Sequence, residues 1–216
     1  MKIRRWAVVA LFAVTFTFTF AGAALASGTS RAAGEAVIAP VADEPALRVS
    51  GRFGEDLESQ LRAWLGRYPQ TQVLVVRSPG GLRWQALEVA ELVNARGITV
   101  RIEGRCASAC ALLWAAADSR EMTFDSRLGL HGSRLPAWLP LPAGVRGWIV
   151  AYNDRQTNRV LRAAGFPQRL IEQGHRTPPT AMSWYDAAEL QLGGVPFVLR
   201  GDGRSDQGRR LPPLSS

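Results

Sequence analysis

The sequence predicts an α/β fold, because segments typical of buried strands alternate with segments typical of helices. Residues 73–76 are a continuous apolar run, as expected of a strand that is covered on both faces, and residues 98–102, with apolar Ile98, Val100 and Ile102, are a second expected strand. Between them, Leu87, Ala90 and Val93 recur at helical spacing. Repeated strand–helix units of this kind build a layered α/β domain, and the length of the chain suits a single one.

The remaining elements follow from the same two patterns, read along the chain. Apolar positions at helical spacing end at glycine or proline, and the short apolar runs between them are strands. The expected strands are 47–53, 73–76, 98–102, 122–124, 128–130 and 195–199, and the expected helices are 57–65, 87–97, 107–117, 145–164 and 184–192.

The first 26 residues have the three-part pattern of a secretory signal peptide. A basic start (residues 2–5) precedes an uncharged apolar run (6–20) and a small-residue cleavage site, Ala-Leu-Ala at 24–26. The alternative is an uncleaved membrane anchor. Either way, we expect the rest of the chain to be exported, for example to a periplasm, with any membrane contact made only through an uncleaved N-terminal segment.

Composition marks the two ends of the expected domain. Residues 27–46 are rich in Ala, Gly, Ser and Pro and read as a flexible linker, and residues 201–216 read as a disordered tail. The folded domain is therefore expected over 47–200. The formal net charge of +8 comes mostly from scattered arginines, without a basic run, so we expect no nucleic-acid binding.

Three short motifs, each at the end of an expected strand, carry the candidate chemistry. They are Ser-Pro-Gly-Gly (78–81), Cys-Ala-Ser-Ala-Cys (106–110) and Leu-Gly-Leu-His (128–131). Ligands of open α/β sheets bind at the carboxyl ends of the strands, where such loops meet. A diglycine turn, a serine among small residues and a histidine are together the parts of a serine hydrolase.

Each part has a chemical role. Ser108, at the start of an expected helix, is the candidate nucleophile, and His131 is the candidate base that takes its proton. The backbone N–H of Ala109 and that of Gly80 or Gly81 are candidate oxyanion-hole donors.

The alternatives are structural. Ser108 would be a small packing residue and His131 a core histidine. Asp118 and Asp125 are candidate orienting carboxylates by sequence proximity alone, and His175 is expected in an exposed polar loop.

Cys106 and Cys110 favour a disulfide, because an exported protein folds in an oxidising compartment. The alternative is a pair of small buried side chains. A metal site is disfavoured, since two thiolates need further ligands and the chain has only 2 histidines. We expect no metal and no cofactor.

At these motifs the chain resembles the ClpP/crotonase superfamily, in particular ClpP-type serine peptidases and their exported ClpP-like relatives. The resemblance runs from Leu47 to Leu199 and includes Met182-Ser183 followed by Ala187-Ala188-Glu189-Leu190. It implies a spiral of repeated ββα units, with Ser108 as nucleophile, His131 as base, and Ala109 and the diglycine as oxyanion hole. It also implies peptide or unfolded-protein substrates and association into homo-oligomers.

One departure from this family matters. Its peptidases carry an aspartate a few residues before the Met-Ser position, whereas Pro179 and Thr180 stand there in this chain. The sequence therefore leaves open an ATP-independent peptidase with a Ser-His dyad, or a scaffold that binds peptides or envelope partners without cutting. A crotonase-type acyl-thioester site ranks last, because acyl-CoA is not expected outside the cytoplasm.

Overall fold

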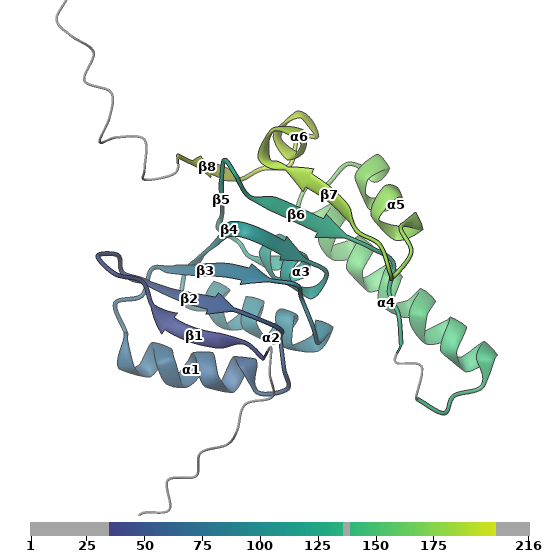
Figure 1. Cartoon of the computed structure of the whole chain (residues 1–216), viewed down its shortest axis with the longest axis horizontal. Helices are drawn as coiled ribbons and strands as arrows, with labels where there is room; N and C mark the ends of the chain where they lie inside the picture. Colours follow the sequence, from purple (N-terminus) through teal and green to yellow (C-terminus); the bar gives the residue numbers. More distant parts are fainter. Residues whose placement is uncertain (1–34, 136–138, 202–216) are drawn as a thin grey trace, which may run out of the picture. The chain divides into compact units, whose positions relative to one another are not determined.

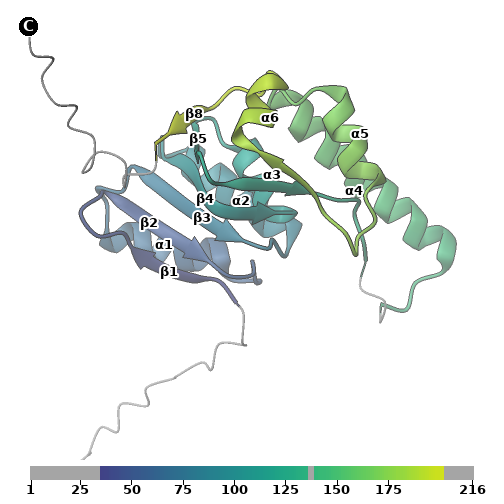
Figure 2. The ribbon, with the colours of Figure 1, turned by 45° about the horizontal axis from the view of Figure 1, so that its top comes forward.

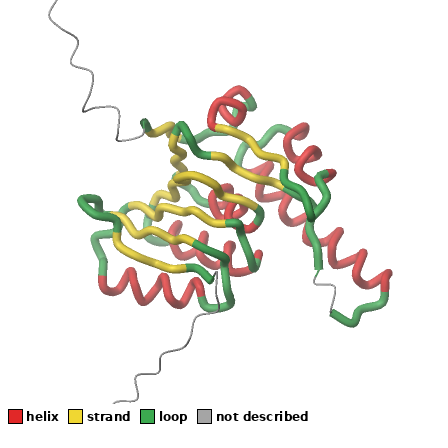
Figure 3. The backbone as a smooth tube through the Cα atoms, in the orientation of Figure 1, coloured by secondary structure: helices red, strands yellow, loops and turns green. Residues whose placement is uncertain are grey.

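The computed structural model describes residues 35–135 and 139–201, which form an eight-stranded mixed sheet and six helices (Figures 1 and 3). The expected α/β class is thereby confirmed. The expected signal peptide, the first part of the expected linker and most of the expected tail lie outside the described residues. The strands are β1 (Val37–Pro40), β2 (Ala46–Ser50), β3 (Val73–Ser78), β4 (Thr99–Ala107), β5 (Arg120–Thr123), β6 (Arg127–Leu130), β7 (Ser183–Asp186) and β8 (Val198–Arg200). The helices are α1 (Leu57–Arg67), α2 (Arg83–Asn94), α3 (Ala109–Ala116), α4 (Ala143–Ala163), α5 (Gln168–Arg176) and α6 (Ala187–Leu192).

Strands β2, β3, β4 and β5 are parallel neighbours in chain order. Because each crossover between parallel strands is right-handed, α1, α2 and α3 are all placed on one face of the sheet (Figure 2). Leu74, Val100 and Ile102 point into this layer and are fully buried. Trp114 of α3 is also fully buried, and its indole N–H donates to the carbonyl of Glu121 at 2.8 Å.

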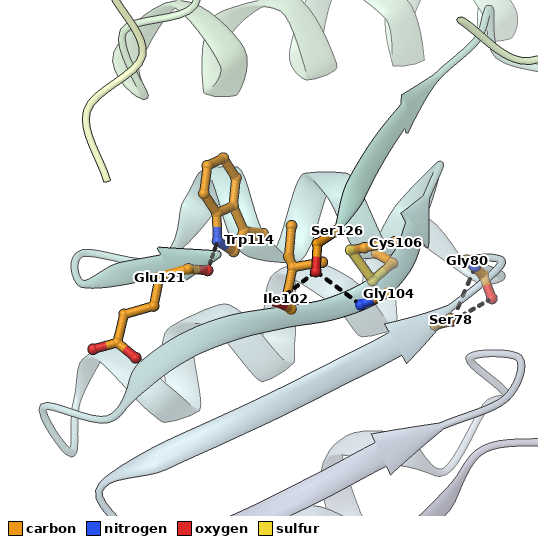
Figure 4. The surroundings of a disulfide bond; sticks show 9 residues. Ser78, Gly80, Ile102, Gly104, Cys106, Trp114, Glu121 and Ser126 are labelled. Atoms are coloured by element: carbon orange, nitrogen blue, oxygen red, sulfur yellow. Dashed lines mark hydrogen bonds between the residues drawn. A yellow bond between two sulfur atoms is a disulfide. The ribbon is translucent and has the colours of Figure 1, made fainter. Parts of the chain in front are cut away.

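Strand β4 changes its neighbour part-way along. Its first half, Val100 to Ile102, pairs with β5, and its second half, Arg105 to Ala107, pairs with β6. The change occurs at Gly104, whose positive φ of 85° bends the strand. Ser126 stabilises this bend by bonding the β4 backbone on both sides of it. Its hydroxyl accepts from the Gly104 N–H at 2.8 Å and donates to the Ile102 carbonyl at 3.1 Å (Figure 4).

The opposite face of the sheet carries an ion-pair ladder. Arg101 and Glu121 are register neighbours on β4 and β5, with 2.7 Å between guanidinium and carboxylate. Arg101 also pairs with Glu44 at 2.6 Å, and the other oxygen of Glu121 pairs with Arg200 at 2.7 Å. Burial alone would raise the pKa of Glu121, but hydrogen bonds from Arg200 and Arg101 outweigh it, so the pKa is lowered.

Three expectations about the elements were wrong. Residues 37–40, expected in the linker, form β1, which pairs antiparallel with β2 because Ile38 is buried beside Val49. Trp184 to Asp186 were expected in a helix but pair with β6 as β7, and the helix α6 starts only after Asp186. His175, expected in a loop, lies in the last turn of α5.

Local sequence features explain where α6 begins and why α5 is a helix. Asp186 and Glu189 form a capping box, each side chain bonding the other's backbone N–H, which starts α6 after the strand. In α5, Leu170, Ile171 and Gly174 form a buried stripe at helical spacing. Among the described residues, no helix has the length and apolarity to cross a membrane.

The lowered pKa of Glu121 predicts acid sensitivity. A depressed carboxyl pKa stabilises the fold above its unfolded value of about 4.5, and this contribution is lost as the pH falls through the folded pKa. Glu121→Gln should therefore lower the free energy of unfolding at pH 7 by about 2–3 kcal/mol, because the buried guanidinium group of Arg101 loses a charged partner. The variant should also lose less stability than the wild type between pH 7 and pH 3. Denaturant unfolding at both pH values checks this, with exposed Glu172→Gln as control; equal losses for Glu121→Gln and the control would contradict it.

Candidate active site

Ser108 stands where β4 ends and α3 begins. It is half-buried, and its backbone has φ 57° and ψ −121°, a conformation that side chains other than glycine rarely adopt. Holding a non-glycine residue there costs about 1–3 kcal/mol and persists only where the surroundings impose it. Two backbone bonds impose it here: the Ser108 N–H donates to the Gly129 carbonyl at 2.9 Å, and the Leu112 N–H donates to the Ser108 carbonyl at 3.1 Å.

A disulfide spans the same turn. Cys106 at the end of β4 and Cys110 in the first turn of α3 are joined by a 2.04 Å bond, with 5.2 Å between their Cα atoms (Figure 4). Both residues are fully buried. Because Ser108 lies midway between them, the bond closes a short loop around the candidate nucleophile and limits the backbone conformations that the turn can reach.

The diglycine lies directly beside this turn. The register pairs Ser78 with Cys106, which brings Gly80 next to Ser108. A Cβ atom on Gly80 would lie 2.8 Å from the Ser108 Cβ and 2.9 Å from the Ala109 nitrogen. Only glycine therefore fits at this position, and any side chain would obstruct the approach to the Ala109 N–H.

The two glycine amides differ. The Gly80 N–H donates to the buried hydroxyl of Ser78 at 2.9 Å, so it already has a partner. Gly81 forms a bridge with Phe53, in which Phe53 bonds the Gly80 carbonyl and the Leu82 N–H. The N–H of Gly81 faces away from Phe53 in such a bridge, and no acceptor for it is found in the described part of the chain. Gly81 is thus the better donor of the two.

Ala109 supplies the second amide. It is the first residue of α3, and the first N–H groups of a helix have no acceptor within the helix. The Ala109 N–H has no acceptor anywhere in residues 35–135 and 139–201. The positive end of the helix dipole lies at the same point, which favours negative charge there.

His131 follows β6 directly and is half-buried. Its Nδ1 lies 2.7 Å from the carbonyl oxygen of Gly132. Because a carbonyl can only accept, Nδ1 carries the proton and donates it, which leaves Nε2 of the neutral ring with a free lone pair. The ring is therefore held in the tautomer that a general base requires.

Ser108 and His131 lie at the ends of neighbouring parallel strands. Ala107 pairs with Gly129, so the chain leaves β4 at Ser108 beside the segment that leads to His131. No hydrogen bond joins the Ser108 hydroxyl to the imidazole in the part of the chain that the structure describes. Catalytic hydrogen bonds are often long before substrate binds, so this arrangement is compatible with both binding and catalysis.

The other sequence candidates lie elsewhere. Asp118 follows the C-terminal end of α3, about 12 Å along the helix axis from Ser108. Asp125 accepts from the Thr123 hydroxyl at 2.8 Å and is exposed. His175 pairs with Asp154 of α4 at 3.3 Å, a contact between two helices that no local sequence pattern indicates.

Two groups near the site were missed from the sequence. The Gly132 carbonyl orients the imidazole, and no side-chain pattern signals a backbone acceptor. Arg83, at the start of α2, donates to the Thr157 hydroxyl of α4 at 3.4 Å and so links the diglycine segment to that helix. Burial lowers the pKa of Arg83.

Within the described residues, no group of three or more His, Cys, Asp or Glu side chains is arranged to hold a metal ion. The groups that the structure places at this site are an alcohol, an imidazole and backbone amides. No protein-family model matches this chain, and no curated protein is significantly similar to it.

The positive φ of Ser108 predicts that glycine is tolerated better than alanine at this position. Ser108→Gly should be more stable than Ser108→Ala by about 1 kcal/mol, because glycine adopts a φ of 57° without steric cost. Both variants lack the hydroxyl, so the comparison isolates the backbone conformation. Thermal unfolding of the two proteins measures it. An alanine variant as stable as the glycine variant would show that the turn is not held in this conformation.

Proposed function

We propose that this chain is an exported ClpP-like serine hydrolase, a peptidase that acts without ATP through a Ser108–His131 dyad. The observation that carries the proposal is the strained strand-to-helix turn that presents Ser108 next to the Ala109 N–H. A serine on a sharp strand-to-helix turn of this kind is the nucleophile in α/β-hydrolases, where the next residue's N–H also serves the oxyanion hole.

The arrangement of the parallel strands and their crossover helices also supports the proposal. Parallel strands with crossover helices place Ser108, His131 and the diglycine at one edge of the sheet, where α/β folds bind ligands. The ClpP-like spiral of ββα units remains part of the proposal. It is supported by the order of the motifs along the chain and by the bend of β4 toward β6 and β7.

In the proposed reaction, the Ser108 hydroxyl attacks the carbonyl carbon of a peptide bond while Nε2 of His131 accepts its proton. The resulting oxyanion is stabilised by the N–H groups of Ala109 and Gly81. His131 then gives the proton to the leaving amine, and an acyl-serine remains. Water, activated by the same imidazole, releases the acid product and restores Ser108.

The aspartate that peptidases of this family use is replaced by a different orienting group. In a serine–histidine–aspartate triad, the carboxylate fixes the histidine tautomer, and its loss costs about four orders of magnitude in turnover. Here the Gly132 carbonyl bonds Nδ1–H and fixes the same tautomer. A neutral carbonyl stabilises the imidazolium less than a carboxylate does, so slow turnover is expected.

The alternative function is a ClpP-like scaffold that binds peptides or envelope partners without cutting them. The lack of a hydrogen bond between Ser108 and His131 in the described residues favours it. Both functions share one binding edge and the same partner chemistry, a peptide or an unfolded protein, and differ only in whether Ser108 reacts.

Export and self-association belong to the same proposal. The signal-peptide pattern supports a periplasmic or otherwise exported location, and the disulfide is consistent with an oxidising compartment. Val145, Trp148 and Tyr152 lie 45%, 62% and 43% exposed on α4, and the rings of Trp148 and Tyr152 stack at 5.8 Å. An exposed aromatic stripe of this kind supports the homo-oligomer that the resemblance implies.

A fluorophosphonate probe tests the proposed function. The wild-type protein should be labelled, and mass spectrometry should place the adduct on Ser108, because the turn exposes its hydroxyl beside a base and an oxyanion hole. Ser108→Ala should abolish labelling, and His131→Ala should slow it at least about 100-fold, the usual effect of losing a general base.

Ser119, an exposed serine bonded to Thr99, provides the matched control, and Ser119→Ala should label like the wild type. Equal labelling of wild type and Ser108→Ala, or none of either, would contradict the hydrolase. Peptide binding that persists without labelling would favour the scaffold.

A further inference from the structure

The peptide group between Gly132 and Ser133 connects His131 to a buried carboxylate. Its carbonyl oxygen accepts from Nδ1–H of His131 at 2.7 Å, and its N–H donates to Oδ1 of Asp154 at 3.0 Å. The described chain contains no cis peptide bond, so the two dipolar ends of this group point in opposite directions. The peptide therefore lies between the imidazole on one side and the carboxylate on the other.

From this geometry we infer that Asp154 is the positioning residue of the base and acts on His131 through the 132–133 peptide. The inference rests on the proposed function and names a part of its machinery. A negative charge at the N–H end polarises a peptide so that its carbonyl becomes a stronger acceptor. The Gly132 carbonyl thereby holds Nδ1–H more firmly, and the imidazolium that forms during proton transfer is stabilised.

The burial and the contacts of Asp154 fit the role of a positioning residue. It lies in the middle of α4 and is only 9% exposed, and a carboxylate is rarely buried to this extent unless it is paired. Its first oxygen bonds Ser133 and its second lies 3.3 Å from Nδ1 of His175 on α5. Both oxygens are thus directed at the segment that carries His131 and at the helix that packs against it.

The same peptide segment is fixed from a second side. The Gly132 N–H donates to the carbonyl of Thr177, which follows α5, at 2.9 Å. A Cβ on Gly132 would lie 2.8 Å from the carbonyl oxygen of His175, so the close approach requires glycine. With Gly132 held by α5 and Ser133 held by α4, the orientation of the carbonyl that contacts the imidazole is determined.

This arrangement accounts for the substitution at Pro179 and Thr180. A carboxylate in direct contact with the imidazole is not needed to select the tautomer, because a charged group one peptide further away performs that task. The sequence gives no sign of it, since Asp154 lies 23 positions after His131 and on a different element.

The test compares Asp154→Asn with the wild type by two independent measurements. Asparagine has nearly the same shape and can still accept from the Ser133 N–H, so it removes the charge and keeps the fold. The first measurement is the rate of fluorophosphonate labelling at Ser108, resolved into probe affinity and maximal rate. We expect the maximal rate to fall about tenfold, with the affinity unchanged, because a hydrogen bond that the Ser133 N–H donates to a charged acceptor is stronger than one to a neutral acceptor.

The second measurement is the ¹⁵N NMR spectrum of His131, which reports the tautomer whether or not the protein is an enzyme. We expect the wild type to show a protonated Nδ1 and an unprotonated Nε2, and Asp154→Asn to shift both signals toward a mixture of tautomers. Glu172→Gln, which removes an exposed carboxylate from α5, should change neither the labelling rate nor the spectrum.

The outcomes separate the two proposals. Labelled wild type with an unchanged maximal rate and unchanged His131 signals in Asp154→Asn would overturn the role of Asp154 and leave the hydrolase intact. Unlabelled wild type would overturn the hydrolase, and the NMR shift alone would then decide the role of Asp154. If Asp154→Asn does not fold, the wild-type Ser133 amide decides: a slowly exchanging, low-field proton supports the bond to the carboxylate, and rapid exchange overturns it.

Discussion

The bend of β4 is the constraint on which the site depends. This strand must pair with β5 over its first half and with β6 over its second half, and it can do so only by turning at Gly104. The turn carries the end of the strand away from the plane of β5 and toward the diglycine on one side and β6 on the other. Two contacts stabilise this course of the backbone. Ser126 bonds the strand at Gly104, and the Cys106–Cys110 disulfide joins the end of β4 to the first turn of α3.

The strain at Ser108 follows from that path. The chain must leave β4 and start α3 within one residue, because the Ser108 N–H still bonds β6 while its carbonyl already accepts from the helix. A positive φ is the geometric result, and the Ala109 N–H is left without an acceptor in the described chain. A strained residue persists only where the surrounding fold stabilises it, and such residues cluster at functional sites.

The orienting group of the base is the least expected feature. The imidazole is held by backbone, and the charge that could strengthen this contact lies one peptide further away, on α4. Such an indirect carboxylate fixes orientation well but transmits less charge stabilisation than a direct one. Slow hydrolysis of accessible peptides, or binding of them without cleavage, is the function that we propose for such a site.

Local patterns predicted the strands of the sheet core and the positions of Ser108, His131 and the diglycine at strand ends, because burial and turn chemistry are both local signals. The separate roles of Gly80 and Gly81 could not be predicted, since they depend on contacts with Ser78 and Phe53 across the sheet. Strand β7 was assigned to a helix because its aromatic residues lead directly into α6, although the Asp186–Glu189 capping box marked the boundary. The contact between Asp154 and the Ser133 N–H has no local sequence signal, because it comes from the packing of α4 against the segment after β6.

The most direct test of the account is a crystal structure of the protein with an aryl phosphonate bound to Ser108. The account predicts that the phosphonyl oxygen lies within about 3.1 Å of the Ala109 and Gly81 nitrogens, as oxyanion-hole donors require. It also predicts Nε2 of His131 within about 3.2 Å of the Ser108 oxygen, with Nδ1 still bonded to the Gly132 carbonyl. A phosphonyl oxygen directed into solvent, or an imidazole turned away from Ser108, would contradict it.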